Sequence, residues 1–205
     1  SSANPEMNTS KFRYSYSSMT TPNSVVEYDM ISKDMKVLKE TEVLGGKFDK
    51  NNYQSKRVWA EARDGKKVPV SLVYRKDMYK NGENPLLLYG YGSYGISIPP
   101  SFSASRLSLI HRGMVYAIAH IRGGMEKGKK WYEDGKKRKK LNSFNDFISC
   151  AKFLKKKNIS GNISIHGGSA GGLLIGASLN ISPDTFHCAV AEVPFVDVLN
   201  TILDE

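Results

Sequence analysis

A single serine stands in a glycine cluster at residues 167–172, which read Gly-Gly-Ser-Ala-Gly-Gly. The β-branched run 163–165 precedes the cluster, and small and apolar residues with helical character follow it. The pattern fits G-x-S-x-G, in which a strained turn between a strand and a helix lifts a serine hydroxyl above the edge of a sheet. Ser169 is therefore a candidate nucleophile. The N–H of Ala170, at the start of the helix, is a candidate donor to an oxyanion.

Other readings of this short motif remain open when it is taken alone. A glycine-rich turn without chemistry has the same composition, because glycine permits backbone angles that a Cβ would forbid. A phosphate-binding loop is a second alternative, although the Lys-Ser/Thr ending of a P-loop does not follow Ser169. The surrounding elements must decide between these readings.

Continuously apolar segments separated by helical stretches surround the motif and predict buried parallel strands. A hairpin signal, Asp64-Gly65 between two apolar runs, comes before them. The predicted strands are 85–89, 114–119, 163–165 and 188–191, and the predicted helices are 103–111, a helix entered at Asn142-Ser143 that continues to residue 154, and 173–179. This order predicts an α/β fold with a mostly parallel sheet covered on both faces.

The first fifty residues have a different pattern, in which alternating residues predict three or four short antiparallel strands between 11 and 50. Such a piece resembles a small meander or one blade of a propeller, and it cannot bury both of its faces alone. Gly45-Gly46 and the polar stretch 49–52 suit a hinge. We therefore expect one domain over 1–50 and another over 51–205.

The composition bounds the class of protein. The 205 residues are 40% hydrophobic and 24% charged, and no apolar run approaches the ~18 residues of a membrane helix. The sequence also lacks a secretory signal pattern. Cys150 and Cys188 lie in apolar segments without metal or redox spacing, and we interpret both as reduced core residues of a cytoplasmic protein. Because the first residue is Ser1, we expect the numbering to begin inside a longer protein.

The formal net charge of +10 is concentrated in lysine-rich runs at 127–130, 136–140 and 155–157. Such runs are usually solvated faces, and lysines at helix ends suit the helix dipole. The alternative is an electrostatic patch for nucleic acid between Lys127 and Lys140. No recognition motif accompanies the lysines, which disfavours this alternative.

Three strand ends carry unusual residues, and active groups of such sheets sit at the carboxyl ends of strands. The first is Tyr-Gly-Tyr-Gly-Ser-Tyr-Gly at 89–95, the second is Arg-Gly-Gly at 122–124, and the third is the Ser169 motif. From the residues alone, Tyr91 is either an oxyanion donor or an aromatic side chain packed at a strand end. We interpret Tyr89 and Tyr94 as packed aromatic residues.

These motifs, together with Trp-Tyr-Glu-Asp-Gly-Lys at 131–136, Phe-Asn-Asp at 144–146 and Val-Pro-Phe-Val-Asp-Val at 193–198, resemble the prolyl oligopeptidase family of serine peptidases in order and spacing. Within that family the chain looks closer to the oligopeptidase B group. The resemblance implies an α/β-hydrolase sheet, partial in this chain, after the last antiparallel blade of a β-propeller. It also implies no metal and no organic cofactor.

The resemblance implies roles for three residues. Ser169 would be the nucleophile that forms an acyl-enzyme. The Tyr91 hydroxyl and the Ala170 N–H would both stabilise the oxyanion.

The family's chain order is Ser, then the acid, then His. His187 is the only histidine after Ser169, and it matches no catalytic position of the family. The triad Asp and His are therefore expected to be absent from this chain. All four histidines, His111, His120, His166 and His187, are interpreted as structural or solvent-exposed. Asp197 and Asp204 come too early for the acid.

The resemblance further implies short peptide substrates cleaved after Lys or Arg. The composition predicts no membrane partner, and the lysines without a recognition motif disfavour nucleic acid. The stretch 98–101, Ile-Pro-Pro-Ser, lacks the carboxylate found there in bacterial forms, since Pro99 and Ser101 stand in its place. Without a base, the 205 residues alone are expected to be inactive as a peptidase. An oxyanion hole by itself accelerates the reaction only about 10³- to 10⁴-fold over water. The alternative is a catalytically dead remnant that serves only as a binding surface.

Overall fold

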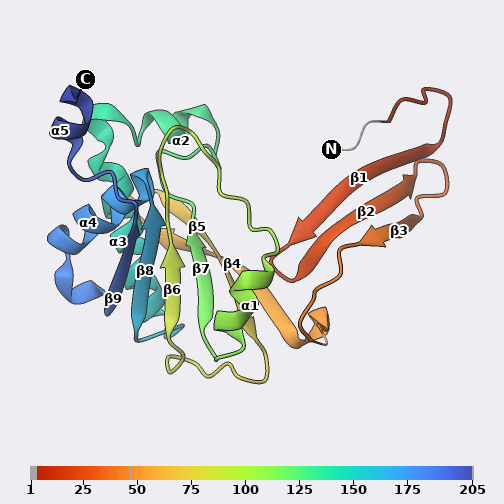
Figure 1. The fold of residues 1–205 in the computed structure, drawn as a ribbon, viewed down its shortest axis with the longest axis horizontal. Coiled ribbons are helices and arrows are strands. Elements are labelled where there is room, and N and C mark those ends of the chain that lie inside the picture. Colours follow the sequence, from red (N-terminus) through yellow and green to blue (C-terminus); the bar gives the residue numbers. More distant parts are fainter. Residues whose placement is uncertain (1–3, 47, 205) are drawn as a thin grey trace.

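A computed structural model describes residues 4–46 and 48–204 and contains two separate β-sheets (Figure 1). The first is antiparallel and has three strands: β1 (Lys11–Ser18), β2 (Thr21–Asp29) and β3 (Met35–Glu40). It projects away from the rest of the molecule on the right of the view. The antiparallel strands predicted within the first fifty residues are confirmed.

The second sheet has six strands in the order β4-β5-β7-β6-β8-β9. Its strands are β4 (Tyr53–Glu61), β5 (Lys67–Arg75), β6 (Leu86–Tyr89), β7 (Val115–Ala119), β8 (Ile163–Gly168) and β9 (Cys188–Glu192). β4 and β5 form the predicted hairpin, whose turn places Gly65 at φ +77°. β5 meets β7 antiparallel, and all later pairings are parallel.

Helices cover both faces of this sheet, with α1 on one face and α3 and α4 on the other (Figure 1). The helices are α1 (Ala104–Ile110), α2 (Lys129–Glu133), α3 (Leu141–Lys156), α4 (Ala170–Ile181) and α5 (Val198–Leu203), with 3₁₀ turns at Lys50–Asn52, Lys137–Lys139 and Pro183–Thr185. The mostly parallel α/β architecture is confirmed.

The start of α3 differs from the prediction of an entry at Asn142-Ser143. Lys140 already has helical angles, φ −57° and ψ −31°, so the helix begins at Leu141. The Ser143 hydroxyl does not cap the helix, because it donates to the carbonyl oxygens of Arg122 at 2.7 Å and Gly135 at 3.1 Å. A tertiary contact therefore uses the side chain that stands at the predicted entry of the helix.

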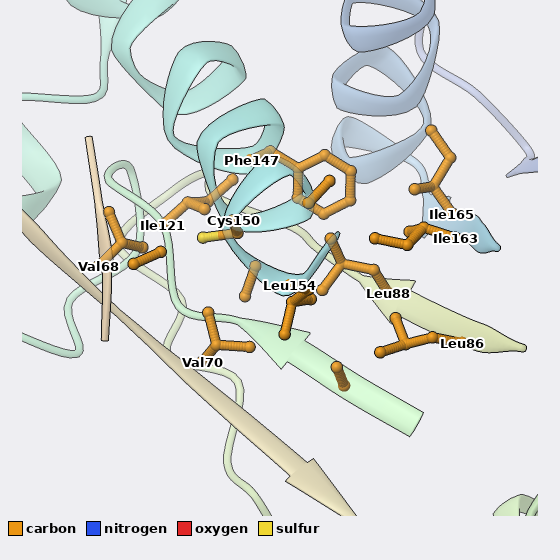
Figure 2. Close-up of a cluster of buried hydrophobic side chains, with 14 of the residues drawn as sticks. Val68, Val70, Leu86, Leu88, Ile121, Phe147, Cys150, Leu154, Ile163 and Ile165 are labelled. Atoms are coloured by element: carbon orange, nitrogen blue, oxygen red, sulfur yellow. The ribbon is translucent and has the colours of Figure 1, made fainter. Parts of the chain in front are cut away.

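The main core lies between the sheet and α3 (Figure 2). Alternate residues of neighbouring strands point at this helix, which contributes Phe147, Cys150 and Leu154. The fully buried strand residues include Val68, Val70, Leu86, Leu88, Ile163 and Ile165. Burial raises the pKa of the Cys150 thiol well above its usual range. The prediction that Cys150 is a core residue is confirmed.

Cys188 contradicts the corresponding prediction, because its side chain is exposed. It lies on β9, the edge strand of the six-stranded sheet, which pairs only with β8 among the described residues. An apolar run predicts burial only where both neighbours of the strand are present. β9 instead leaves four of its five residues exposed, including Val190.

The two sheets touch at the turn between β1 and β2. Met19, only 5% exposed, packs with Tyr53 and Ile118 of the larger sheet and with residues of α1. The Ser17 hydroxyl accepts a hydrogen bond from Phe102 N at 3.1 Å. Nowhere in residues 4–46 or 48–204 does a helix have the length and apolar character needed to cross a bilayer.

Candidate active site

The carboxyl ends of β6, β7 and β8 meet at one edge of the six-stranded sheet, at the top of Figure 1. Tyr89 pairs with Ile118 on one side and with His166 on the other. Gly90 N donates to the carbonyl oxygen of His166 at 3.2 Å, which ties the end of β6 to β8. The three sequence motifs at these strand ends therefore lie together, although more than seventy residues of chain separate the first from the last.

Ser169 occupies the sharp turn between β8 and α4. Its backbone angles, φ +53° and ψ −118°, are rarely adopted by a residue with a side chain. The surrounding structure enforces them: Ser169 N donates to Glu192 O at 2.9 Å, and Phe195 N donates to Ser169 O at 3.1 Å. The residue is exposed. This is the strained strand-to-helix turn that the glycine pattern predicts.

Glycines make this turn possible because backbone approaches backbone. A Cβ on Gly167 would lie 2.5 Å from the carbonyl oxygen of Gly171, and a Cβ on Gly172 would lie 2.6 Å from Cα of Pro194. Both distances are shorter than real Cβ contacts. The two glycines therefore fix the entry of α4 against β8 and the segment after β9.

Tyr91 lies against the first turn of α4. A Cβ on Gly171 would meet the Gly90 carbonyl oxygen at 2.8 Å and Tyr91 Cδ2 at 3.4 Å. Tyr91 is half-buried. Ala170 is the first residue of α4, so its N–H has no acceptor within the helix. The structure thus brings the three predicted residues, Ser169, Ala170 and Tyr91, to one strand-end region.

A buried ion pair supports the middle strand end. Arg122 is 2% exposed, and its guanidinium bonds Asp146 at 2.5 and 2.8 Å and Asp64 at 2.7 Å. Burial alone would lower the pKa of Arg122, but the hydrogen bonds to these carboxylates raise it above its usual range. Asp146, on α3, also accepts from Arg122 N at 3.1 Å. It therefore anchors the 121–124 loop.

Two side chains, Glu126 and Lys140, hold the loop that follows β6 by hydrogen bonds that the sequence did not predict. The Glu126 carboxylate accepts from Ile98 N at 3.0 Å, and Lys140 Nζ donates to Gly92 O at 2.6 Å and to Ser93 Oγ at 2.7 Å. Burial lowers the pKa of Lys140 to about 8. No local pattern distinguishes Lys140, because it is one of five consecutive basic residues. For Lys140, the expectation of a solvated face is wrong.

Three other lysines of the stretch 127–140 lie close to particular side chains. Lys127 Nζ lies 4.4 Å from the centre of the Trp131 ring, and Lys139 Nζ lies 2.8 Å from an oxygen of Asp134. Lys130 also faces Asp134, at 3.7 Å. The stretch 127–140 is therefore not a uniform patch of free cations.

The aromatic residues next to Tyr91 differ from each other. Burial raises the pKa of the Tyr89 phenol, and the Tyr89 ring meets His166 edge-on with centroids 5.5 Å apart. Tyr94 is 69% exposed at φ +57°. The prediction that Tyr94 is packed is wrong, because the tight loop turns its side chain outward.

Among the described residues, no hydrogen bond joins a histidine to Ser169. The histidines have these surroundings: His111 bonds Tyr53 at 2.5 Å, His120 bonds Ser71 at 2.8 Å, His166 bonds Glu192 at 3.1 Å, and His187 is exposed. The late carboxylates also lie elsewhere, since Asp197 caps α5 and Asp204 follows that helix.

A mostly parallel sheet with a serine on a strained turn after an interior strand is typical of an α/β-hydrolase. The antiparallel sheet β1–β3 before it matches a β-propeller blade. The model of the prolyl oligopeptidase family matches residues 100–205. The chain belongs to this family of serine peptidases.

Individual relatives agree with this assignment. The chain is 50% identical to dipeptidyl aminopeptidase BI of Pseudoxanthomonas mexicana over 99% of its length, and 42% identical to protease 2 of Moraxella lacunata over 92%. It spans about 28% of the length of each of these curated relatives.

Solved structures give the same result. Oligopeptidase B from Trypanosoma brucei with covalently bound antipain matches with a TM-score of 0.85 and 50% identity, covering 94% of this chain and 28% of that one. Oligopeptidase B from Leishmania major matches with a TM-score of 0.86 and 46% identity, covering 96% and 28%.

Proposed function

We propose that the protein containing this chain hydrolyses short peptides through an acyl-enzyme on Ser169. The observation that carries the proposal is the exposed Ser169 on a strained turn, with Tyr91 packed against the first turn of α4. Membership of a serine peptidase family supports the peptide bond as the target.

In the proposed reaction, Ser169 Oγ bonds to the peptide carbonyl carbon as its proton passes to a base. The Tyr91 hydroxyl and the Ala170 N–H donate to the oxyanion that forms. When the oxyanion collapses, the C–N bond breaks and the amine leaves with the proton. Water then hydrolyses the ester to release the acid and restore the Ser169 hydroxyl.

The base and its acid are proposed to come from parts of the protein outside residues 1–205. The surroundings of the four histidines support this, since each described histidine has another partner or faces solvent. Residues 1–205 alone are accordingly proposed to be inactive. The alternative is a catalytically dead protein that uses this surface only for binding.

Cleavage after Lys or Arg is proposed from the similarity to oligopeptidase B. A relative named as a dipeptidyl aminopeptidase is equally similar in sequence, so release of dipeptides from a free N-terminus is the second candidate. No carboxylate stands at 98–101, and Glu126 is held by Ile98 N. The residues that would recognise a basic side chain are proposed to lie elsewhere in the protein.

We also propose a domain boundary between residues 50 and 51, where the first sheet has ended and β4 has not begun. A reducing, cytoplasmic location is proposed from the two free cysteines.

The proposal is tested by fluorophosphonate labelling and peptide hydrolysis with the full-length protein that contains this chain. Ser169→Ala should abolish labelling and lower hydrolysis by roughly 10⁴-fold or more. Tyr91→Phe should lower kcat by about 10²- to 10³-fold. Ser164→Ala, the same change earlier on β8, is the matched control and should label normally.

Substrates that vary the residue before the cleaved bond, with free and blocked N-termini, distinguish the two specificities. Labelling that survives Ser169→Ala, with unchanged hydrolysis, would refute the peptidase proposal. Failure of the unmodified full-length protein to label would favour the dead protein. Binding of nucleic acid that weakens between low and moderate salt would favour the basic-patch alternative.

A further inference from the structure

Lys140 directs its ammonium group into the protein, unlike its neighbours in the basic run. Lys137, Arg138 and Lys139 are exposed, whereas Lys140 is half-buried. Its Nζ donates to the carbonyl oxygen of Gly92 at 2.6 Å and to the Ser93 hydroxyl at 2.7 Å. Both acceptors belong to the loop that carries Tyr91.

Neither an ion pair nor stabilisation of the helix explains why this ammonium group points into the protein. Among the described residues, no carboxylate forms an ion pair with Lys140, and its third neighbour is the Phe144 ring at 5.9 Å. It occupies the N-cap position of α3, where the helix dipole disfavours a cation. Burial also lowers its pKa. The contacts with the loop are therefore what the side chain contributes.

The loop needs such an anchor because its backbone is permissive. Gly90, Gly92 and Gly95 alternate with the residues that carry side chains, and Gly92 and Gly95 have positive φ angles of 65° and 69°. Glycine loses more conformational entropy on ordering than other residues. The Gly92 carbonyl also packs tightly, since a Cβ on Gly123 would lie 2.0 Å from its oxygen.

We propose that Lys140 is a positioning residue for Tyr91. By binding the carbonyl of the next residue and the hydroxyl of the one after it, Lys140 holds the backbone from which the Tyr91 phenol projects towards α4. An oxyanion donor is effective only if it is oriented before the reaction begins. This proposal rests on the proposed function.

The test is a double-mutant cycle between Lys140 and Tyr91 in the full-length protein, read as kcat and KM for a peptide substrate. Lys140→Met removes the donors and keeps most of the side-chain volume. We expect kcat to fall about 10- to 100-fold, part of the loss expected for the whole donor, with KM changed less than about threefold. Lys139→Met, the same change at the neighbouring residue that binds Asp134, should change kcat less than about twofold.

The decisive measurement is the same substitution in a Tyr91→Phe protein. If Lys140 acts through the phenol, Lys140→Met should then change kcat less than about threefold. Equal losses in both backgrounds, or an unchanged kcat in the single variant, would overturn the proposal. Ser93→Ala removes only one of the two contacts and provides the same comparison if Lys140→Met does not fold.

The outcomes separate the two proposals. If Ser169→Ala abolishes hydrolysis but Lys140 and Tyr91 show no coupling, only the positioning role is wrong. If Ser169→Ala leaves hydrolysis unchanged, the proposed function fails and the positioning role fails with it.

Discussion

The strand-end region around Ser169 and the three-stranded sheet β1–β3 are built in opposite ways. The first region is supported by side chains with no exposed surface, such as Phe147 and Ile165, and by the buried Arg122–Asp146 pair. In the second, every residue of β3 is exposed, and Met35 and Val37 have more than half of their surface in solvent. Regular strands occur in both regions, so strand formation alone does not indicate a core.

The geometry of the site depends on the packing around its own sheet. The six-stranded sheet supplies its own support, because helices cover both of its faces. A three-stranded sheet has too little area to bury a face unless another element packs on it. The site should therefore respond strongly to changes in its own sheet and weakly to changes in β1–β3.

The largest expected effect comes from breaking matched ion pairs in the two regions. Asp146→Asn leaves the Arg122 charge buried with only Asp64 as carboxylate partner, and should lower the free energy of unfolding by about 3–5 kcal/mol. Glu27→Gln breaks the exposed pair with Arg13 and should cost about 0–1 kcal/mol. Urea unfolding followed by far-ultraviolet circular dichroism, which reports on the strands of both sheets, measures both changes, and equal losses would contradict the comparison.

The next effect concerns two glycines of α4. Gly171→Ala places a Cβ 2.8 Å from the Gly90 carbonyl oxygen and should cost about 1–3 kcal/mol, with a loss of hydrolysis in the full-length protein. Gly176→Ala meets only Val196 at 3.7 Å and should stabilise the helix by about 0.5–1 kcal/mol. A harmless Gly171→Ala would show that the approach of β6 to α4 is not essential.

A smaller effect is the pH dependence of stability, which should differ between the regions. Burial lowers the pKa of Lys140 from 10.5 to about 8, so the unfolded chain binds more protons between these values. Stability should therefore rise as the pH increases from about 8 to 10.5. In Lys140→Met, thermal unfolding measured across this pH range should show a smaller rise in stability.

The acidic range provides the counterpart in β1–β3. The hydrogen bond from Lys11 lowers the pKa of Asp29 from 3.8 to about 2. The stabilisation of the folded state by this lowered pKa is complete above pH 3.8 and should be lost as the pH falls through about 2. Asp29→Asn should remove it without changing the alkaline rise. If Asp29→Asn instead altered the alkaline rise, the two regions would not be independent.

The smallest effect tests the exposed face directly. Val37→Ala in the chain 1–205 should change the free energy of unfolding by no more than about 0.5 kcal/mol, because Val37 is 57% exposed. In the full-length protein the same substitution should cost about 1 kcal/mol if another blade covers β3. Equal, small values in both proteins would mean that this face stays in solvent.

Several features are predictable from local sequence patterns. Local patterns determined the Asp64-Gly65 hairpin, the α/β order and the turn at Ser169, because residues adjacent in the chain specify turns and strand periodicity. The motifs also gave the family. The same patterns could not place Tyr91 beside α4, which depends on the strand order that sets β6 next to β8.

Which of several similar residues is buried depends on the tertiary packing. Lys140 and Lys139 are neighbours in one basic run, yet only Lys140 reaches the Tyr91 loop. Cys150 and Cys188 lie in similar apolar segments, yet one is in the core and the other on an edge strand. Burial depends on what packs against a residue from distant parts of the chain, and local sequence does not contain that information.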